Sequence, residues 1–237
     1  MRPIVLARCD PDETFGVAIQ AFDDAGAPVR IWQALDGEPR PELDEAAGVV
    51  VFGSTYNVEH ADEQPFIEEL RTITIDAVER GVPYLGVCFG SQILAWSLGG
   101  AVGKAAVREF GFVPVRPTPS AQDDRLFGHL EDGDAAFQWH MDTFELPPGA
   151  ELLVRGDEVE HQAFRVGDRA WAAQFHFEVN GDELEHWLES YGPEARLVAE
   201  WGRSWAEVRE QARTHLAAHE ARGREIFRRF AQVAQES

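Results

Sequence analysis

The stretch PYLGVCFGSQILAWSLGG, Pro83–Gly100, places one cysteine between two glycines and between two apolar runs. The run before the cysteine, Tyr84–Val87, is typical of a short buried strand. Ile93–Leu98, after it, has the apolar density of a helix that packs on a sheet. Cys88 is therefore predicted to lie on the turn that joins a strand to a helix.

The glycines Gly86 and Gly90 each lie two residues from Cys88. The resulting G-x-C-x-G pattern is typical of a nucleophile elbow, a tight strand-to-helix turn in which glycines relieve crowding and one side chain projects above the sheet. The backbone N–H groups and the dipole of the following helix favour a thiolate. A buried structural cysteine is the alternative, because free cysteines are often buried. The two glycines, with the strand and helix around them, favour the nucleophile.

Apolar strand-like runs alternate with helical patterns in the first part of the chain. This alternation predicts an α/β fold with a doubly wound, mostly parallel sheet. The Val-rich run Gly48–Phe52 does not alternate with polar residues, which is typical of a strand that is buried on both faces. The strand-like runs are Ile4–Arg8, Val29–Leu35, Gly48–Phe52 and Tyr84–Val87, and the helical patterns cover 12–25 and 61–80.

The later part of the chain differs in character. Short β-like pieces separated by Pro, Gly and Asp fill residues 101–166, and the chain after Asn180 reads as helical. We therefore expect one domain over residues 1–180 and a helical extension, 181–237, packed on it. The tryptophans of this extension are expected to pack it onto the domain, and a lid or partner surface is the alternative; they are Trp187, Trp201 and Trp205.

Composition excludes several classes of function. The 237 residues, 44% of them hydrophobic, suffice for a sizeable core. The formal net charge of −21, with Lys104 as the only lysine, argues against binding to nucleic acid. Neither a signal sequence nor an apolar stretch long enough to cross a membrane is recognisable, so we expect a cytoplasmic protein.

Two cysteines, Cys9 and Cys88, do not make a disulfide framework. Cys9 falls on the first predicted strand, where it is expected to stay buried and protonated. A thiol nucleophile at Cys88 needs a base, and that base needs a group that orients it.

His176 has the most suitable surroundings for such a base. It belongs to AWAAQFHFE, Ala170–Glu178, which is predicted to be a strand that ends in His-x-Glu. Residues two apart on a strand share a face, so Glu178 is expected beside the His176 ring. A hydrogen-bonded core histidine is the alternative, and the carboxylate at this spacing favours the catalytic interpretation.

Four motifs together carry a family resemblance. They are GVCFGSQ at Gly86–Gln92, LGG at Leu98–Gly100, WHMD at Trp139–Asp142 and QFHFE at Gln174–Glu178. Over about residues 45–180 the chain resembles a class I glutamine amidotransferase, in particular the glutaminase domain of GMP synthase and its stand-alone relatives. The resemblance implies a flavodoxin-like amidotransferase fold and hydrolysis of glutamine without a cofactor.

The resemblance also implies residue roles. Cys88 would attack the γ-carboxamide of glutamine, His176 would relay protons, and Glu178 would orient His176. Formation of the resulting thioester would release ammonia, and the thioester would then be hydrolysed to glutamate. Oxyanion-hole N–H groups would come from Gly53 and Phe89. The residues that match glutamine-binding positions of the family are Gln92 and, through their backbone, Gln138 and Trp139. His140 and Asp142 match the family's usual His-x-Asp pair, whose role is more positional than catalytic.

Two positions depart from the family pattern. Phe177 stands where the family usually has proline, which is expected to change local rigidity more than chemistry. The loop Phe52–Thr55 keeps only one of the usual two glycines, Gly53.

Three functions remain open at this level. The first is a glutamine-hydrolysing amidotransferase whose ammonia passes to an unknown acceptor or a separate synthase, because the chain shows no ATP-activating loop after the amidotransferase motifs. The second is a γ-glutamyl peptide or amine hydrolase with the same triad. The third is a non-enzymatic thiol sensor, which would not need His176 or Glu178.

Other motifs are weaker. His215 and His219 have the i, i+4 spacing of metal ligands on a helix, but no third ligand accompanies them, so a solvated helix face is the preferred interpretation. Gly99–Lys104 does not match a phosphate-binding loop, because the first glycine and the final Ser or Thr are missing. No metal site is predicted.

Overall fold

The computed structural model describes residues 1–236. Within them a nine-stranded sheet has the order β2-β1-β3-β4-β9-β8-β7-β5-β6. The strands are β1 (Ile4–Ala7), β2 (Val29–Trp32), β3 (Gly48–Val51), β4 (Tyr84–Val87), β5 (Val102–Pro117), β6 (Asp134–Phe144), β7 (Ala150–Arg155), β8 (His161–Val166) and β9 (Ala170–Ala173). The helices are α1 (Ala18–Asp24), α2 (Pro65–Arg80), α3 (Phe89–Ser97), α4 (Gly181–Ser190), α5 (Glu194–Trp201) and α6 (Trp205–Gln235).

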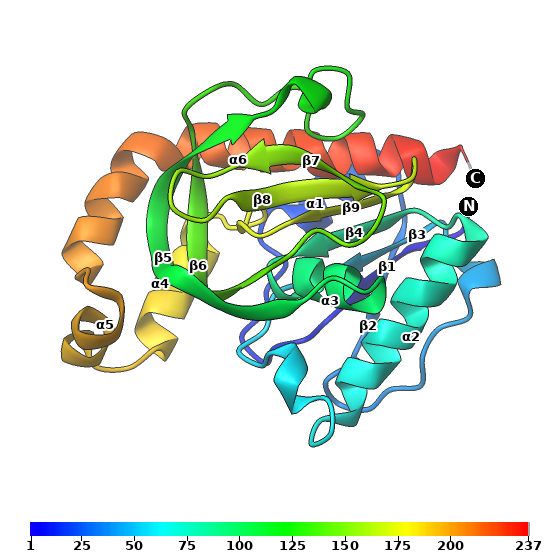
Figure 1. The fold of residues 1–237 in the computed structure, drawn as a ribbon, viewed down its shortest axis with the longest axis horizontal. Helices are drawn as coiled ribbons and strands as arrows, with labels where there is room; N and C mark the ends of the chain where they lie inside the picture. Colours follow the sequence, from blue (N-terminus) through cyan, green and yellow to red (C-terminus); the bar gives the residue numbers. More distant parts are fainter. Residues whose placement is uncertain (237) are drawn as a thin grey trace.

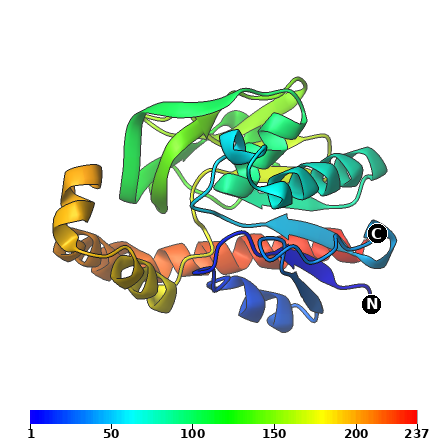
Figure 2. The ribbon, with the colours of Figure 1, turned by 90° about the horizontal axis from the view of Figure 1, so that it is seen from below.

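The first half of the sheet is parallel. β1 pairs with β2 and β3, β3 pairs with β4, and β4 pairs with β9, all in parallel. Helices α1 and α6 lie on one side of these strands, and α2 and α3 lie on the other (Figure 2). Every residue of β1, β3, β4 and β9 is buried, as expected for strands covered on both faces. The predicted doubly wound α/β fold is confirmed.

The second half of the sheet is antiparallel. β8 pairs with β9 and β7, and the long strand β5 pairs with β7 and β6. The short β-like pieces expected between residues 101 and 166 are parts of β5, β6 and β7. The strongly curved β5–β6 pair lies between the rest of the sheet and the end of the molecule that α5 and the start of α6 form (Figure 1).

Several predicted boundaries are wrong. The helix expected over 12–25 is limited to Ala18–Asp24, because Phe15 and Gly16 before it have positive φ angles of 66° and 46°. The strand expected to run to Glu178 ends at Ala173. Beyond it the chain turns away from β4, and the N–H of His176 donates to the carbonyl of Phe137 in β6 at 2.8 Å. Cys9 lies in the loop just after β1 rather than on the strand.

Helix α6 covers one face of the sheet and supports the loop after β9. Phe227 packs edge-on against Phe22 of α1, with 5.3 Å between ring centroids. At Gly223 the helix passes so close to this loop that an added Cβ would lie 1.9 Å from the carbonyl oxygen of Phe177. The C-terminal segment therefore supplies part of the core, while the domain division at residue 180 stays a prediction.

The close approach at Gly223 gives a stability prediction. Glycine to alanine inside a helix normally stabilises by up to about 1 kcal/mol. In Gly223→Ala we expect the opposite sign, a loss of about 1–3 kcal/mol in the free energy of unfolding, because the methyl group must displace the Phe177 carbonyl. Denaturant unfolding measures it, with Gly103→Ala as the control, since a Cβ at Gly103 meets nothing within 4 Å. A more stable Gly223→Ala variant would contradict the packing.

No helix within residues 1–236 combines the length and the apolar character needed to cross a membrane.

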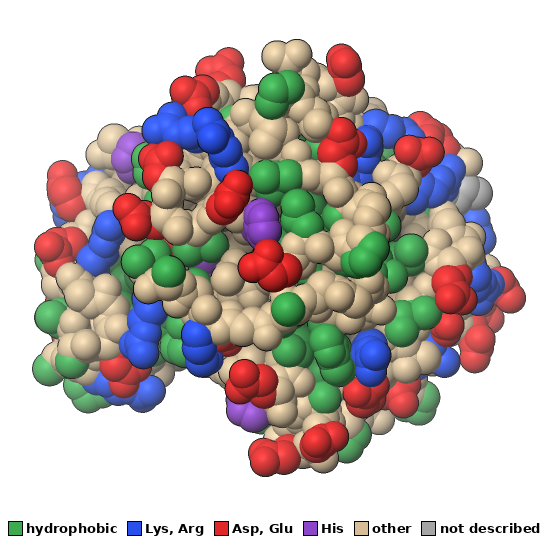
Figure 3. Space-filling model, viewed as in Figure 1, with side chains coloured by type: hydrophobic (Ala, Val, Ile, Leu, Met, Phe, Trp, Pro, Cys, Tyr) green, Lys and Arg blue, Asp and Glu red, His purple; other side chains and the backbone are tan. Residues whose placement is uncertain are grey.

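On the face shown in Figure 3, acidic and basic side chains are interspersed, and the surface is hollowed between the α4–α5 end, at lower left, and the body of the molecule.

Candidate active site

Cys88 lies on a tight turn between β4 and α3. Its backbone has φ 49° and ψ −102°, a positive φ that is rare for a non-glycine residue. A Cβ at Gly86 would lie 2.4 Å from the carbonyl oxygen of Gly90, and a Cβ at Gly90 would lie 2.0 Å from that of Val51. Both glycines are therefore required by close backbone contacts, and the turn has the geometry of a nucleophile elbow.

His176 and Glu178 lie beside this turn. The Nδ1 of His176 donates to Glu178 Oε1 at 2.7 Å, and both side chains are buried. A Cβ at Gly53 would lie 2.8 Å from His176 Cε1 and 3.9 Å from Cys88 Cβ. Gly53 thus leaves the space in which the imidazole and the thiol meet.

The charges around His176 favour its protonated form. Burial alone would lower the pKa of His176, but the charges of Cys88 and Glu178, with hydrogen bonds to both, raise it well above its usual value. The His176–Glu178 contact expected from the spacing is present, although both residues lie in a loop rather than on a strand.

Gln174 is a site residue that the sequence patterns did not predict. Its Nε2 donates to the sulfur of Cys88 at 3.6 Å, and its Oε1 accepts from Nε2 of Gln92 at 3.3 Å. Gln174 thus links the sulfur of Cys88 to the side chain of Gln92. The signal available in the sequence was its position two residues before His176.

Two further carboxyl groups lie close to Glu178, namely Glu13 and Glu183, both buried. Glu183 Oε1 accepts from the hydroxyl of Thr14 at 2.7 Å and from its N–H at 3.1 Å, so α4 is tied to the loop before α1. Burial, and then the charge of Glu178, raise the pKa of Glu183. Burial and the charges of Glu183 and Glu178 raise the pKa of Glu13. This pair therefore holds a proton to higher pH than ordinary carboxyl groups do.

A cavity of about 460 Å³ opens beside Cys88 and His176. Six of the seven predicted substrate-binding residues line it, namely Gly53, Phe89, Gln92, Trp139, His140 and Asp142. Gln138 does not; its side chain is buried and its Nε2 donates to Gln162 Oε1 at 2.8 Å, because this position of β6 faces β8.

His140 and Asp142 are held by fixed partners. The Nε2 of His140 lies 2.9 Å from the buried carboxylate of Glu109 on β5. Asp142 Oδ1 lies 2.8 Å from Nζ of Lys104, and its Oδ2 accepts from Nδ2 of Asn57 at 3.3 Å. These contacts fix the cavity wall opposite the elbow.

One histidine of helix α6, His219, is buried rather than exposed to solvent as predicted. His219 is buried against the ring of Phe112, 5.5 Å away, so the expected solvated face is wrong for this residue. Burial lowers the pKa of His219 to about 3, which keeps the ring neutral. The described residues 1–236 contain no group of three or more His, Cys, Asp or Glu side chains placed to hold a metal ion.

The tryptophans pack as expected. Trp187, Trp201 and Trp205 contact an apolar cluster that includes Phe110 and Phe137 of the β5–β6 pair. Trp187 and Trp201 also line the cavity.

Comparison with known proteins gives the family. A family model described as glutamine amidotransferase class-I matches residues 16–190. The chain belongs to this family. Its curated relatives include the glutamine-hydrolysing GMP synthase of Porphyromonas gingivalis, 34% identical over 145 residues, or 60% of this chain and 27% of the relative. Another is the GMP synthase of Herminiimonas arsenicoxydans, 33% identical over 65% of this chain and 28% of the relative.

The chain thus spans little more than a quarter of these GMP synthases. Among solved structures, a glutamine amidotransferase from Thermotoga maritima is 25% identical, with a TM-score of 0.87 over 98% of this chain and 99% of that one. A glutamine amidotransferase from Methylobacillus flagellatus, 24% identical, has a TM-score of 0.89 over 98% of this chain and 95% of that one. The amidotransferase fold includes the C-terminal helix.

The two cysteines should differ in reactivity. Burial, and then the charge of Glu13, raise the pKa of Cys9, which is fully buried, whereas Cys88 lines the cavity. We expect iodoacetamide at neutral pH to label Cys88 at least about tenfold faster than Cys9, with glutamine slowing the reaction at Cys88. Peptide mass spectrometry over time measures both rates. Equal labelling, or faster labelling of Cys9, would mean that the elbow does not present an activated thiol.

The buried carboxyl pair gives a pH prediction. Because the folded pKa values of Glu13 and Glu183 are raised, the native state holds a proton that the unfolded state loses above about pH 4.3. Stability contributed by the protonated pair therefore falls as pH rises above that value.

Glu183→Gln removes one of the two acids and keeps an oxygen for Thr14. We expect this variant to gain stability relative to wild type as pH increases from 5 to 8, measured by urea unfolding at each pH. The exposed exchange Glu189→Gln on the same helix is the matched control. A stability difference that is constant with pH would contradict the assignment.

Proposed function

We propose that this protein hydrolyses the γ-carboxamide of glutamine, with Cys88 as nucleophile, His176 as proton relay and Glu178 as the group that orients His176. The arrangement of the elbow, Gly53 and the buried His176–Glu178 pair supports this proposal most directly. It matches the general requirement for a nucleophile, a base and an orienting carboxylate within contact of one another.

In the first half of the reaction Cys88 Sγ attacks the amide carbon. Backbone N–H groups of Gly53 and Phe89 stabilise the oxyanion, since both residues line the cavity beside the sulfur. The C–N bond breaks as His176 gives its proton to the departing nitrogen, and ammonia leaves. The raised pKa of His176 suits a residue that must hold this proton.

In the second half water attacks the thioester, and His176 takes the proton from that water. Glutamate leaves, and the thiolate–imidazolium pair is restored. The ammonia acceptor in this proposal is another molecule, a separate synthase being one such partner. A reducing compartment such as the cytoplasm suits the site, because both cysteines are free thiols.

A γ-glutamyl peptide or amine hydrolase is the second candidate. The same triad would cleave a substituted γ-amide, with an amine leaving in place of ammonia. The size of the cavity favours this candidate, because about 460 Å³ falls in the range of pockets that hold drug-sized ligands, roughly 300–1,000 Å³.

Substitutions in the triad test the proposal. Cys88→Ala should abolish glutamate release and leave the fold intact, and His176→Ala should lower kcat by at least about three orders of magnitude. Glu178→Gln should lower kcat less than His176→Ala does, because the orientation of His176 partly survives. Glutamate release from glutamine is the assay, with circular dichroism as the control for folding. Wild-type turnover in Cys88→Ala or His176→Ala would remove that residue from the mechanism.

A further inference from the structure

One wall of the cavity consists of aromatic side chains that take no part in the proposed hydrolysis of glutamine. Trp139 of β6, Trp187 and Tyr191 at the end of α4, and Trp201 of α5 all line it. The ring of Trp139 lies 6.1 Å from Trp187, 5.5 Å from Tyr191 and 6.2 Å from Trp201, measured between centroids. All four side chains are half-buried, so ring surface remains open to the cavity. We refer to these four residues as the aromatic wall.

The aromatic wall begins at the reacting groups. Trp187 contacts the ring of His176 edge-on, with 5.1 Å between centroids. His176 delivers the proton to the leaving nitrogen in the proposed mechanism, so whatever is attached to that nitrogen must lie on the same side of the cavity as this ring. The wall therefore continues from the leaving-group side of the scissile bond.

Polar groups of the aromatic wall are already engaged within the protein. Trp187 Nε1 donates to the carbonyl of Asp12 at 3.2 Å, and Trp201 Nε1 donates to the hydroxyl of Tyr191 at 2.9 Å. The Tyr191 hydroxyl in turn donates to Glu200. These bonds hold three rings in place and leave their apolar faces for a ligand, an arrangement that favours flat aromatic groups.

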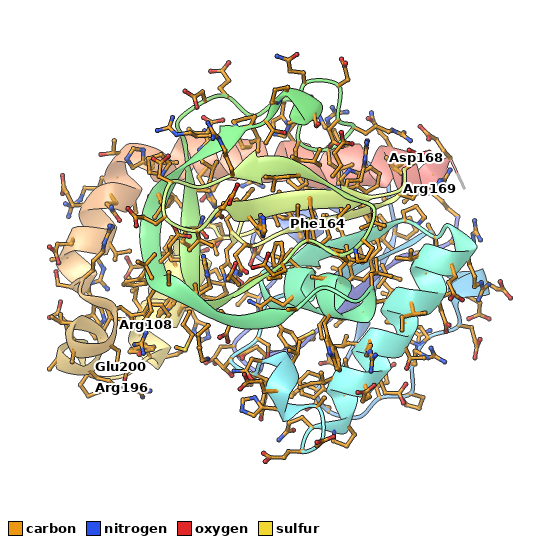
Figure 4. All side chains as sticks on the ribbon, viewed as in Figure 1. Arg108, Phe164, Asp168, Arg169, Arg196 and Glu200 are labelled. Carbon is orange, nitrogen blue, oxygen red and sulfur yellow. The ribbon has the colours of Figure 1, made fainter. Side chains whose placement is uncertain are left out.

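The charges around the cavity select against anions. Asp10, Asp12 and Glu200 line it, and Asp142, which also lines it, is paired with Lys104. Arg196 lines it too, but its Nε donates to Glu200 Oε1 at 3.0 Å and its guanidinium stacks over Tyr191. Figure 4 shows Arg196 and Glu200 together on α5, with Arg108 of β5 beside them. A carboxylate on the leaving group would meet this acidic lining at a cost.

We propose that the aromatic wall is a leaving-group subsite, and that the preferred substrates are γ-glutamyl amides of uncharged or cationic aromatic amines. The inference rests on the triad chemistry proposed above and names its substrate class. The Cys88 sulfur forms a bond to the γ-carbon, the C–N bond breaks, and the amine nitrogen takes the proton of His176. Water then cleaves the thioester to glutamate.

Binding to an inactive variant tests the subsite without turnover. In Cys88→Ala, titration calorimetry compares γ-glutamyl-phenethylamide with γ-glutamyl-ethylamide, which lacks the ring. Burial of the phenyl group predicts binding about 10- to 100-fold tighter for the phenethylamide. γ-Glutamyl-phenylalanine carries the same ring and an added carboxylate, and it should bind more weakly than the phenethylamide. Equal affinity for the phenethylamide and the ethylamide would overturn the subsite.

Substitutions in the aromatic wall localise the effect. Trp201→Ala should reduce the preference for the phenethylamide over the ethylamide about tenfold, and Trp201→Phe should restore most of it. Trp205→Ala is the matched control, because Trp205 packs in the same aromatic cluster but does not line the cavity. A preference that survives Trp201→Ala, or that falls equally in Trp205→Ala, would contradict the assignment.

Turnover by wild type separates this inference from the proposed function. If the Cys88→Ala variant prefers the phenethylamide but wild type releases glutamate from none of the amides, the subsite stands and the proposed hydrolysis fails. If wild type cleaves glutamine and the ethylamide, and the phenethylamide shows no advantage in binding or in kcat/KM, the hydrolysis stands and the subsite fails.

Discussion

The close passage of three backbone segments at the end of β4 is the constraint on which the site depends. Gly90 at the start of α3 lies against the Val51 carbonyl at the end of β3, and Gly86 lies against Gly90. Side chains at either glycine would force α3 away from the sheet. Because the turn is this tight, Cys88 takes a positive φ and projects its sulfur beyond the carboxyl ends of the parallel strands. The following helix then presents its N-terminus to the same point.

The partner groups reach the sulfur through contacts of longer range. The loop after β9 is held by β6 through the His176 N–H, by the chain before α1 through Val17, whose N–H donates to the Glu178 carbonyl, and by α6 at Gly223. Three parts of the chain that are far apart in sequence thus fix one short loop. Because this loop carries Glu178, its position also sets the charge that acts on the buried carboxyl groups of Glu13 and Glu183.

The features of the site that the sequence predicts are those whose causes lie between residues close together in the chain. The elbow was predictable because its cause is local, two glycines around one cysteine between two apolar runs. The His176–Glu178 contact was expected from the spacing alone, yet the reason given was wrong, because the strand ends at Ala173 and the pair lies in a loop. His176 is predicted as the base for Cys88 from its His-x-Glu surroundings, and the family resemblance implies the same pairing, although no local pattern brings these two segments together.

The remaining features depend on tertiary packing. Glu13 and Glu183 each look like ordinary surface acids in sequence, and only the docking of α4 against the loop before α1 buries them together. The aromatic wall likewise forms only when α4 and α5 fold back over β6. The i, i+4 spacing of the histidines on α6 does not indicate that His219 is buried. Gln174 was missed because its role lies in a side-chain contact with Cys88 across the loop.

In the proposed mechanism Cys88 forms the covalent bond to the substrate. Acid quenching of the protein during turnover of glutamine, followed by peptide mass spectrometry, tests it directly. We expect an adduct with the mass of a glutamyl group on the peptide that contains Cys88. Hydroxylamine should remove this adduct, and it should be absent from Cys88→Ala. A glutamyl adduct on Cys9, or release of glutamate by Cys88→Ala with no adduct at any quench time, would show that Cys88 is not the nucleophile.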